Sequence, residues 1–407
     1  MKILANSSKA SEKPSIAITY PFALGEPNGG ARHAREIARH LGESGADIVI
    51  LPVSASPGTH YPRPKVRDEF LGFELDEDLA RYGVDVVRVP QHPLYWRFDG
   101  RHVKKAMSRI LKHRHVDIVL SFYHEGALLP SLLRSRNVKF GYIAAWQSYA
   151  MALKRPKGEG RLIKFVRKRA DNRDIIRPYR LADILFANSQ FTRGELMDVV
   201  GVDGNRIVVS YLGVDPRFSE IPRSAPTEVR RFIFFGRVVP LKGVLDAIKA
   251  LGQLAAKGLN NWTYRILGTG DEQLARNAAR EHGISDKVLV CGAVDDERLR
   301  SELEEADLAI LPSYAESFGL SIAEAQAAGI PVVAYEAGSV PEVVEDGVTA
   351  WLAPIRDVDG LAERIEAAVR NPEMTYRAGL AGRERVKRMF TWHKTAETIL
   401  EGIRAVS

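Results

Sequence analysis

Two glutamates separated by seven residues stand out in the C-terminal half of the chain, at Glu316 and Glu324. They follow an apolar strand pattern at residues 308–311 and flank the start of an expected helix. The start of a helix binds anions, because it combines free N–H groups with the positive end of the helix dipole. A carboxylate beside an anion site needs donors, and the hydroxyls of a ribose or a hexose would serve.

Each glutamate also has a purely structural interpretation. Ser321 and Glu324 match a capping box, in which the glutamate turns back to the start of its own helix. Glu316 would then be a solvated loop acid, because most glutamates are exposed. The pattern alone leaves both interpretations open for each residue.

Two cations lie between another expected strand and helix of the same half, at Arg237 and Lys242. They are either solvated surface charges, which is the commoner fate of Arg and Lys, or a clamp on a diphosphate. A diphosphate leaving group gains negative charge in the transition state, and such a clamp would stabilise it. His124, after a strand pattern of the N-terminal half, is likewise a surface histidine or part of this site.

Short apolar runs alternate with amphipathic stretches along the chain, which is typical of parallel α/β sheets. The strands are expected at residues 16–20, 48–53, 84–89, 116–120, 140–144, 184–187, 207–211, 232–236, 264–268, 288–290, 308–311 and 332–335. Helices are expected at residues 31–45 and 392–405, among others. A length of 407 residues exceeds what one core usually serves, so two domains are expected. Two doubly wound sheets would bind ligands at the carboxyl ends of their strands.

The segment that contains both glutamates resembles the signature of glycosyltransferase family 4, the retaining nucleotide-sugar transferases of the GT-B fold. Phe318-Gly319-Leu320 follows the first glutamate, and Ala328-Gly329-Ile330-Pro331-Val332-Val333 follows the second. Further stretches match in kind and order, at Asn28-Gly29-Gly30, 182–189, 212–215, Phe235-Gly236-Arg237 with Lys242-Gly243, 266–270 and 390–392. The likeness covers nearly the whole chain and is strongest from residue 232 to residue 354.

The resemblance implies an α/β protein with the GT-B fold, in which two Rossmann-like doubly wound domains face each other across a cleft. The acceptor-binding domain would span residues 1–213, with a final helix at 391–407 packing back on it. Residues 214–230, which carry three prolines and weak periodicity, would be the linker. Residues 231–390 would bind the nucleotide-sugar.

The resemblance also implies roles for single residues. Glu324 would accept hydrogen bonds from the ribose, and Glu316 would hold hydroxyls of the transferred sugar. Arg237 and Lys242 would clamp the diphosphate. His124 would face the reactive centre, oriented by Glu125. Further contacts to the donor would come from Phe318, Gly319, Leu320, Gly236, Gly268, Gly292, Ala293, Gly29 and Gly30.

Two of these assignments have plain alternatives. Gly29 and Gly30 would otherwise form an ordinary turn from strand to helix. Cys291, next to the loop expected to bind the base, is interpreted as a small buried apolar residue.

The expected activity is that of a retaining glycosyltransferase, which moves a hexose-type sugar from a UDP- or GDP-sugar to a glycan, lipid-linked or small-molecule acceptor. The nucleotide-sugar is a substrate, and neither a cofactor nor a metal is expected, because no Asp-any-Asp pair occupies a strand end. The alternatives are a sugar-nucleotide epimerase or a phosphorylase of the same fold, or a non-catalytic binder of nucleotide-sugars.

The net charge of +7 would attract anionic partners, but no nucleic-acid motif is present and no nucleic acid is expected. Cations gather at residues 154–180, interleaved with apolar residues, and this stretch would touch anionic membrane. A solvated helix face or a pocket for a phosphorylated acceptor are its alternatives. A single cysteine and the lack of a signal-like or membrane-spanning apolar run indicate a cytoplasmic protein, peripheral at most to the inner face of the membrane.

Overall fold

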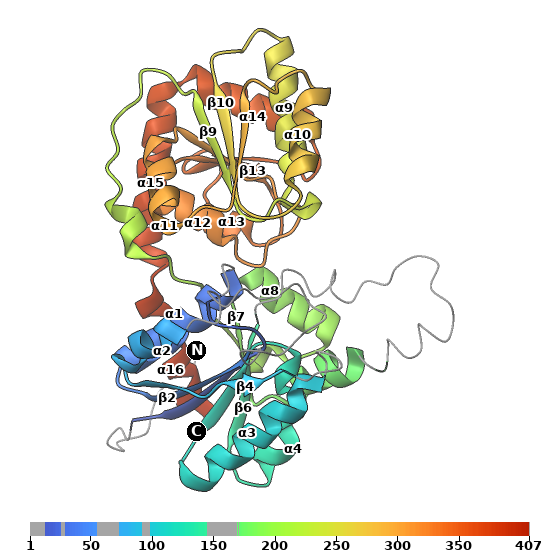
Figure 1. Ribbon diagram of the computed structural model, residues 1–407, viewed down its shortest axis with the longest axis vertical. Helices are drawn as coiled ribbons and strands as arrows, with labels where there is room; N and C mark the ends of the chain where they lie inside the picture. Colours follow the sequence, from blue (N-terminus) through green and yellow to red (C-terminus); the bar gives the residue numbers. More distant parts are fainter. Residues whose placement is uncertain are drawn as a thin grey trace.

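The structure, a computed structural model, describes residues 13–25, 29–54, 73–91, 98–144, 169 and 171–406. Each half of the chain forms a parallel sheet covered by helices, and the two halves lie one above the other in Figure 1. The predicted fold class, with two doubly wound α/β domains, is confirmed. Most of the basic stretch predicted at residues 154–180 lies outside the described residues.

The N-terminal sheet is parallel throughout, with the order β3-β2-β1-β5-β6-β7-β8, and β4 pairs with β2. Its strands are β1 (Ser15–Tyr20), β2 (Asp47–Ser54), β3 (Val84–Val86), β4 (Val89–Pro90), β5 (Ile118–Ser121), β6 (Lys139–Ala144), β7 (Ile184–Ala187) and β8 (Ile207–Val209). The order reverses between β1 and β5, so the loops after these strands diverge to opposite faces. A crevice forms at such a point, at the carboxyl ends of the strands.

Helices cover both faces of this sheet. One face packs against α1 (Gly29–Glu43), α2 (Phe73–Ala80) and α16 (Trp392–Val406), and the other against α3 (Asp99–His113), α4 (Leu129–Arg134) and α7 (Arg177–Leu181). Helix α8 (Gln190–Glu195) follows β7 at the edge that faces the other domain (Figure 1).

The C-terminal sheet is also parallel, with the order β11-β10-β9-β12-β13-β14. Its strands are β9 (Arg231–Phe235), β10 (Thr263–Leu267), β11 (Val288–Gly292), β12 (Leu308–Ile310), β13 (Val332–Tyr335) and β14 (Ala350–Ala353). Its helices are α9 (Val244–Ala256), α10 (Glu272–Glu281), α11 (Asp296–Glu305), α12 (Leu320–Ala327), α13 (Val340–Val343), α14 (Val358–Arg370) and α15 (Pro372–Met389). The order reverses between β9 and β12. Strand β14, a short run with two alanines, is an element that the sequence pattern did not predict.

The chain crosses from one domain to the other twice, and apolar side chains are buried at both crossings. After β8 the amide of Val214 donates to the carbonyl oxygen of Phe390 (2.9 Å), and Ile221 and Val229 are buried. On the return, the final helix α16 packs against α1 in the N-terminal domain, with Trp392 buried at its start. A hydrophobic cluster therefore runs without a break from one domain into the other.

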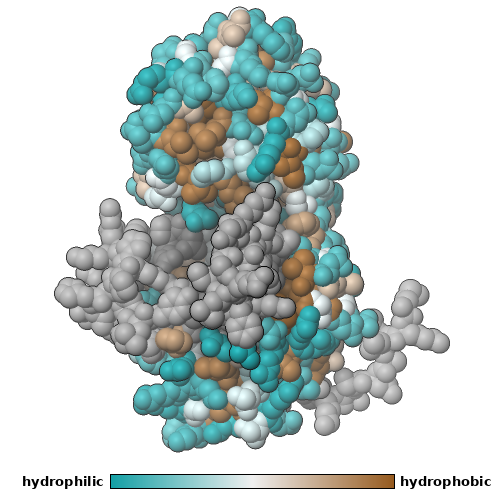
Figure 2. Space-filling model, turned by 90° about the vertical axis from the view of Figure 1, so that its right-hand side faces the viewer, coloured by the Kyte–Doolittle hydropathy of each residue, from teal (hydrophilic) through white to brown (hydrophobic). Residues whose placement is uncertain are grey.

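The surface seen in Figure 2 is mostly hydrophilic and is broken by apolar patches on the upper, C-terminal domain and along its junction with the lower one. Among the helices that the structure describes, none combines the length and the apolar character needed to span a bilayer.

Candidate functional site

The point where the strand order of the C-terminal sheet reverses brings two predicted site residues together. Lys242 follows β9 and Glu316 follows β12, the neighbouring strand. The Lys242 ammonium donates to Oε1 of Glu316 at 2.5 Å, and the two side chains are only 18% and 8% exposed. The interpretation of both as solvated surface charges is therefore wrong. Arg237 is exposed in the same loop as Lys242, and in the described part of the chain it makes no ion pair.

The helix that follows Glu316 begins differently from a capping box. Gly319, with φ of +88°, is the N-cap residue of α12, and none of the described side chains caps this helix. Because the helix already begins at Leu320, Ser321 lies inside its first turn and cannot be the cap residue. The capping interpretation of Glu324 is wrong, and the first N–H groups of α12 have no side-chain acceptor among the described residues. Phe318 is buried and packs edge-on against Phe390, with ring centroids 5.4 Å apart.

Glu324 instead forms an ion pair with Arg32, which comes from the other domain. Arg32 lies in the first turn of α1, and a Cβ on Gly29 would be 3.8 Å from Cδ2 of Leu320. The starts of α1 and α12 therefore face each other across the domain boundary. Sequence reasoning missed Arg32, although a cation in the first turn of a helix opposes the helix dipole and so needs another reason to be there.

The two charges of this pair influence each other strongly. Burial raises the pKa of Glu324, which is 6% exposed, and the Arg32 guanidinium opposes that shift. The nearby carboxylates of Asp215 and Asp296 raise the pKa of Glu324 further. The pKa of Arg32 is raised mainly by Glu324 and to a smaller extent by Asp296 and Asp215. Arg32 is thus the cation that favours an ionised Glu324 inside the domain interface.

Glycines form the ends of three neighbouring strands of the C-terminal sheet. Gly236 follows β9, Gly268 follows β10 and Gly292 ends β11. A Cβ on Gly268, whose φ is +136°, would lie 1.8 Å from the carbonyl oxygen of Gly236, so only glycine fits there. These predicted contacts therefore form one strand-end surface, with Ala293 exposed beside Gly292.

Cys291 requires a correction, because it is exposed rather than buried. It lies on β11, the edge strand of the sheet, where Leu289 is exposed as well. Successive side chains of a strand point to opposite faces, and an edge strand has one face less well covered.

His124 is buried, and its interpretation as a surface histidine is wrong. It lies in a short 3-10 turn (His124–Gly126) directly after β5, at the reversal point of the N-terminal sheet. The carboxylate of Glu125 accepts hydrogen bonds from the amides of Phe122 (2.9 Å) and Tyr123 (3.1 Å) and from Oγ1 of Thr19 (3.1 Å). Glu125 therefore orders the turn that carries His124 through the backbone. Burial raises the pKa of Glu125 to about 7.

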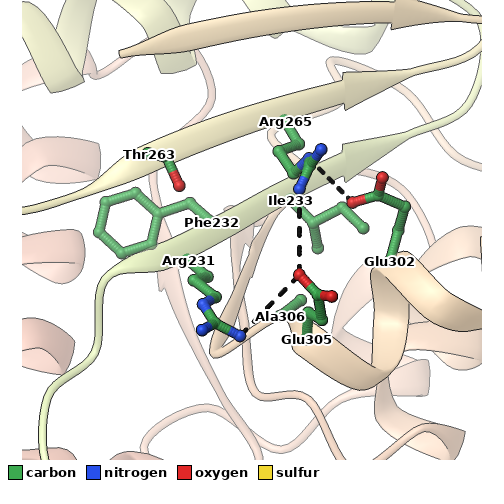
Figure 3. A pocket seen from close by; sticks show the side chains of 8 residues that line it. All are labelled: Arg231, Phe232, Ile233, Thr263, Arg265, Glu302, Glu305 and Ala306. Carbon is green, nitrogen blue, oxygen red and sulfur yellow. Dashed lines mark ion pairs between the residues drawn. The ribbon is translucent and has the colours of Figure 1, made fainter.

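A separate cavity of about 150 Å³ lies at the other end of the strands of the C-terminal sheet, where β9 and β10 begin (Figure 3). Its lining residues come from the beginnings of β9 and β10 and from the end of α11. It contains an ion pair between Arg265 and the buried Glu302, at 2.9 Å. Ligands of doubly wound sheets bind at the carboxyl ends of the strands, so this cavity is not the predicted site. Within the described ranges, no group of three or more His, Cys, Asp or Glu side chains is arranged to hold a metal ion.

Two doubly wound domains with cations and helix starts at their strand ends have the architecture of the GT-B fold, and such sheets bind ligands at these strand ends. Models of two protein families match the chain consecutively. "Glycosyltransferase Family 4" matches residues 27–218, and "Glycosyl transferases group 1" matches residues 218–385. The chain belongs to glycosyltransferase family 4 and is a glycosyltransferase.

Individual relatives agree with this assignment. The glycogen synthase of Mycobacterium tuberculosis (strain H37Rv) is 27% identical over 92% of this chain and 90% of its own length. A D-inositol 3-phosphate glycosyltransferase of Mycolicibacterium smegmatis is 33% identical over 54% of this chain and 52% of its own.

Solved structures share the fold. Sucrose-phosphate synthase from Thermosynechococcus elongatus superposes with a TM-score of 0.74 at 18% identity, covering 97% of this chain and 99% of that one. Anabaena Alr3699/HepE, solved in complex with UDP and glucose, gives a TM-score of 0.71 at 18% identity over 96% and 100% of the two chains. These structures confirm the GT-B fold.

The raised pKa of Glu125 predicts a pH dependence of stability. The folded state keeps the proton up to a pH of about 7, whereas the unfolded state loses it near 4.5. Glu125 therefore adds stability that is complete below pH 4.5 and lost as the pH rises to 7, on the order of 3 kcal/mol in total.

Glu125→Gln should remove this pH dependence of the free energy of unfolding, because the amide does not titrate. The measurement is urea unfolding of the wild type and the variant at several pH values between 4.5 and 8. Other carboxyls whose pKa is raised, such as Glu324 and Glu36, also make the free energy of unfolding depend on pH. Their contribution cancels when the free energy of unfolding of the variant is subtracted from that of the wild type. A difference that does not change with pH would contradict the prediction.

The Arg32–Glu324 pair predicts a coupling between the domains. A double-mutant cycle with Arg32→Leu and Glu324→Gln should give a coupling free energy of about 0.5–3 kcal/mol in urea unfolding. The matched control is the Arg39–Glu43 pair on the surface of α1, whose side chains are 37% and 34% exposed. That cycle should give about 0.3–0.5 kcal/mol. Equal coupling free energies in the two cycles would mean that Arg32 and Glu324 do not contact each other in solution.

Proposed function

We propose that this glycosyltransferase transfers a hexose-type sugar from a UDP- or GDP-sugar to a glycan, lipid-linked or small-molecule acceptor, with retention of the anomeric configuration. The observation that carries the proposal is the Lys242–Glu316 pair at the strand-order reversal of the C-terminal sheet. It places a cation and a hydroxyl-binding carboxylate next to the uncapped start of α12. A nucleotide-sugar needs these three features side by side.

The charges of the site suit a leaving nucleoside diphosphate. Lys242 and Arg237 would stabilise the charge that develops on the diphosphate, and the N–H groups at the start of α12 would add to this. Glu316 would accept hydrogen bonds from the sugar once the incoming phosphate competes for Lys242. With two cations in place, a metal ion is not required for this step, and we propose that none takes part.

The ribose would bind to Glu324 at the domain interface. Arg32 uses Oε1 of this carboxylate, and a carboxylate offers about four acceptor positions, so hydroxyl groups can bind the remaining ones. The base would lie toward Gly292 and Ala293 and be read by main-chain groups. The complex of Anabaena Alr3699/HepE with UDP and glucose supports a nucleotide-sugar as the kind of donor.

The proposed reaction takes place on one face of the sugar. The acceptor hydroxyl attacks the anomeric carbon on the side from which the diphosphate departs. The bond between that carbon and the diphosphate oxygen breaks, and the hydroxyl proton passes to the leaving phosphate. His124, in its buried turn across the cleft, would contact the donor sugar.

The stereochemistry of the product tests this mechanism. Proton NMR of the product formed early in the reaction should show the same anomeric configuration as the donor sugar. An inverted product would exclude the same-face reaction while leaving the donor site unaffected.

The acceptor and the location of the enzyme remain proposals from the sequence. Cations at residues 154–180 support contact with an anionic membrane surface, and one cysteine supports a cytoplasmic location. A lipid-linked acceptor would be consistent with both. An epimerase of the same fold would instead convert the nucleotide-sugar without any acceptor, and a phosphorylase would use inorganic phosphate in place of the nucleotide.

Thermal unfolding with UDP, GDP and ADP, each with and without a linked sugar, tests the donor site. A ligand that binds only the folded protein raises the melting temperature in step with its affinity. One nucleotide should stabilise the wild type, and Lys242→Ala should weaken its binding by at least about tenfold, because a charge-assisted contact to phosphate is lost.

Lys249→Ala is the matched control for this experiment. Lys249 is an exposed lysine on α9, the helix that begins just after Lys242. Its replacement should leave the response to the nucleotide unchanged. A lack of response of the wild type to all three nucleotides would remove the proposed function.

A further inference from the structure

One carboxylate of the C-terminal domain binds the start of a helix in the N-terminal domain. Glu342 lies on α13, and its Oε2 and Oε1 accept hydrogen bonds from the amides of Gln190 (2.7 Å) and Phe191 (2.8 Å). The hydroxyl of Tyr211 donates to Oε2 as well, at 3.0 Å. All three donors belong to the segment before the domain linker, so a single side chain spans the domain boundary.

These bonds complete the cap of α8. The first N–H groups of a helix have no partner within the helix. Ser189 supplies one acceptor from its own chain segment, with its Oγ 3.0 Å from the amide of Thr192. The amides of Gln190 and Phe191 obtain theirs from Glu342 in the other domain. Opening of the domains would therefore break two charge-assisted hydrogen bonds, which are stronger than bonds between neutral groups.

The same turn of the N-terminal domain contacts the loop that carries Glu316. Nδ2 of Asn188 donates to Oγ of Ser317 at 3.1 Å, and Oγ1 of Thr192 lies 3.4 Å from the carbonyl oxygen of Ser317. Thr192 donates to Oδ1 of Asn188 at 2.8 Å, which fixes the orientation of that amide. Ser317 directly follows Glu316, so the contact lies one residue from the carboxylate proposed to hold the sugar.

A second connection ties Glu316 to the helix that bears Glu342. Ser339, the residue before α13, donates to the carbonyl oxygen of Glu316 from its amide (3.1 Å) and from its hydroxyl (3.2 Å). A Cβ on Gly338 would lie 2.2 Å from that same oxygen, which shows how closely the two segments approach. The contacts form a closed ring that runs from Glu316 through Ser339 and Glu342 to α8, and back through Asn188 to Ser317.

We propose that Glu342 and Asn188 are positioning residues, which hold the Glu316 loop in its working geometry only while the two domains are closed. This inference rests on the proposed function, because it assigns to Glu316 the transferred sugar. In the proposed function the donor nucleotide would be held by Lys242, Arg237, Glu324 and the start of α12, and among the described residues none of these groups hydrogen-bonds to Glu342 or Asn188. Loss of the ring should therefore impair transfer of the sugar much more than binding of the nucleotide.

The test uses the full chain with Glu342→Ala, Glu342→Gln and Asn188→Ala. With Glu342→Ala, kcat should fall by about tenfold to a hundredfold, as expected for lost hydrogen bonds to a charged group, and the Kd of the bound nucleotide should stay within about threefold. Glu342→Gln keeps one oxygen acceptor and should recover part of the rate. The double variant Glu342→Ala with Asn188→Ala should be less impaired than the product of the two single effects, because both residues act through the same loop.

Glu345→Gln is the matched control. Glu345 is an exposed carboxylate just after α13, and within the described ranges its side chain forms an ion pair with Arg385, at 4.0 Å. This variant should retain the wild-type kcat and Kd. An unchanged kcat in Glu342→Ala would overturn the proposal. A parallel loss of nucleotide affinity and rate would overturn it too, since that would indicate a general structural role.

Small-angle X-ray scattering separates this inference from the proposed function. Without any ligand, Glu342→Ala should increase the radius of gyration relative to the wild type, because the closed arrangement loses its interdomain cap, and Glu345→Gln should not. If the wild type binds no nucleotide, the proposed function fails, and the scattering still tests the interdomain contact. An unchanged radius in Glu342→Ala would then refute that contact.

Discussion

A carboxylate that leaves water must receive a cation or several N–H groups, because an uncompensated buried charge costs several kcal/mol. Two glutamates near the domain boundary receive a cation, and a third, Glu125, receives N–H and O–H donors while burial still raises its pKa to about 7. Glu316 has Lys242, Glu324 has Arg32, and Glu125 has two backbone amides and a threonine hydroxyl. These contacts tie the loops and helix starts that carry the three carboxylates to their neighbours.

The two cations come from different elements than the carboxylates they stabilise, which links local charge balance to the arrangement of the domains. The amides around Glu125, in contrast, lie only two and three residues before it. Lys242 and Glu316 meet because β9 and β12 are neighbours at the reversal of the strand order. Arg32 reaches Glu324 only because α16 and the linker hold the N-terminal domain in place by a continuous hydrophobic cluster. The apolar packing between the domains and the ionic contacts across the cleft therefore support the same closed arrangement.

Much of the site could be predicted from the sequence, because strand ends and helix starts are visible as changes of periodicity. The contact between Lys242 and Glu316 agrees with the rule that ligand sites form at the carboxyl ends of parallel strands, because the two residues follow the neighbouring strands β9 and β12. Arg32 and Glu342 were missed. Each contacts a residue more than a hundred positions away, and nothing in its own neighbourhood indicates the partner.

The sequence by itself determined the two halves of alternating strands and helices and the positions of most strands. It also showed which residue types follow the strands. These features depend on periodicity and on turn residues, which act over only a few positions. The tertiary structure alone decided which interpretation of an ambiguous residue holds. The sequence allows a capping box of Ser321 with Glu324, but the structure shows that the helix begins at Leu320, with Gly319 as the N-cap residue. The sequence also suggests a buried Cys291, but β11 is the edge strand and Cys291 is exposed. Burial and partnership depend on what the rest of the chain places nearby, and that is a property of the packed domains.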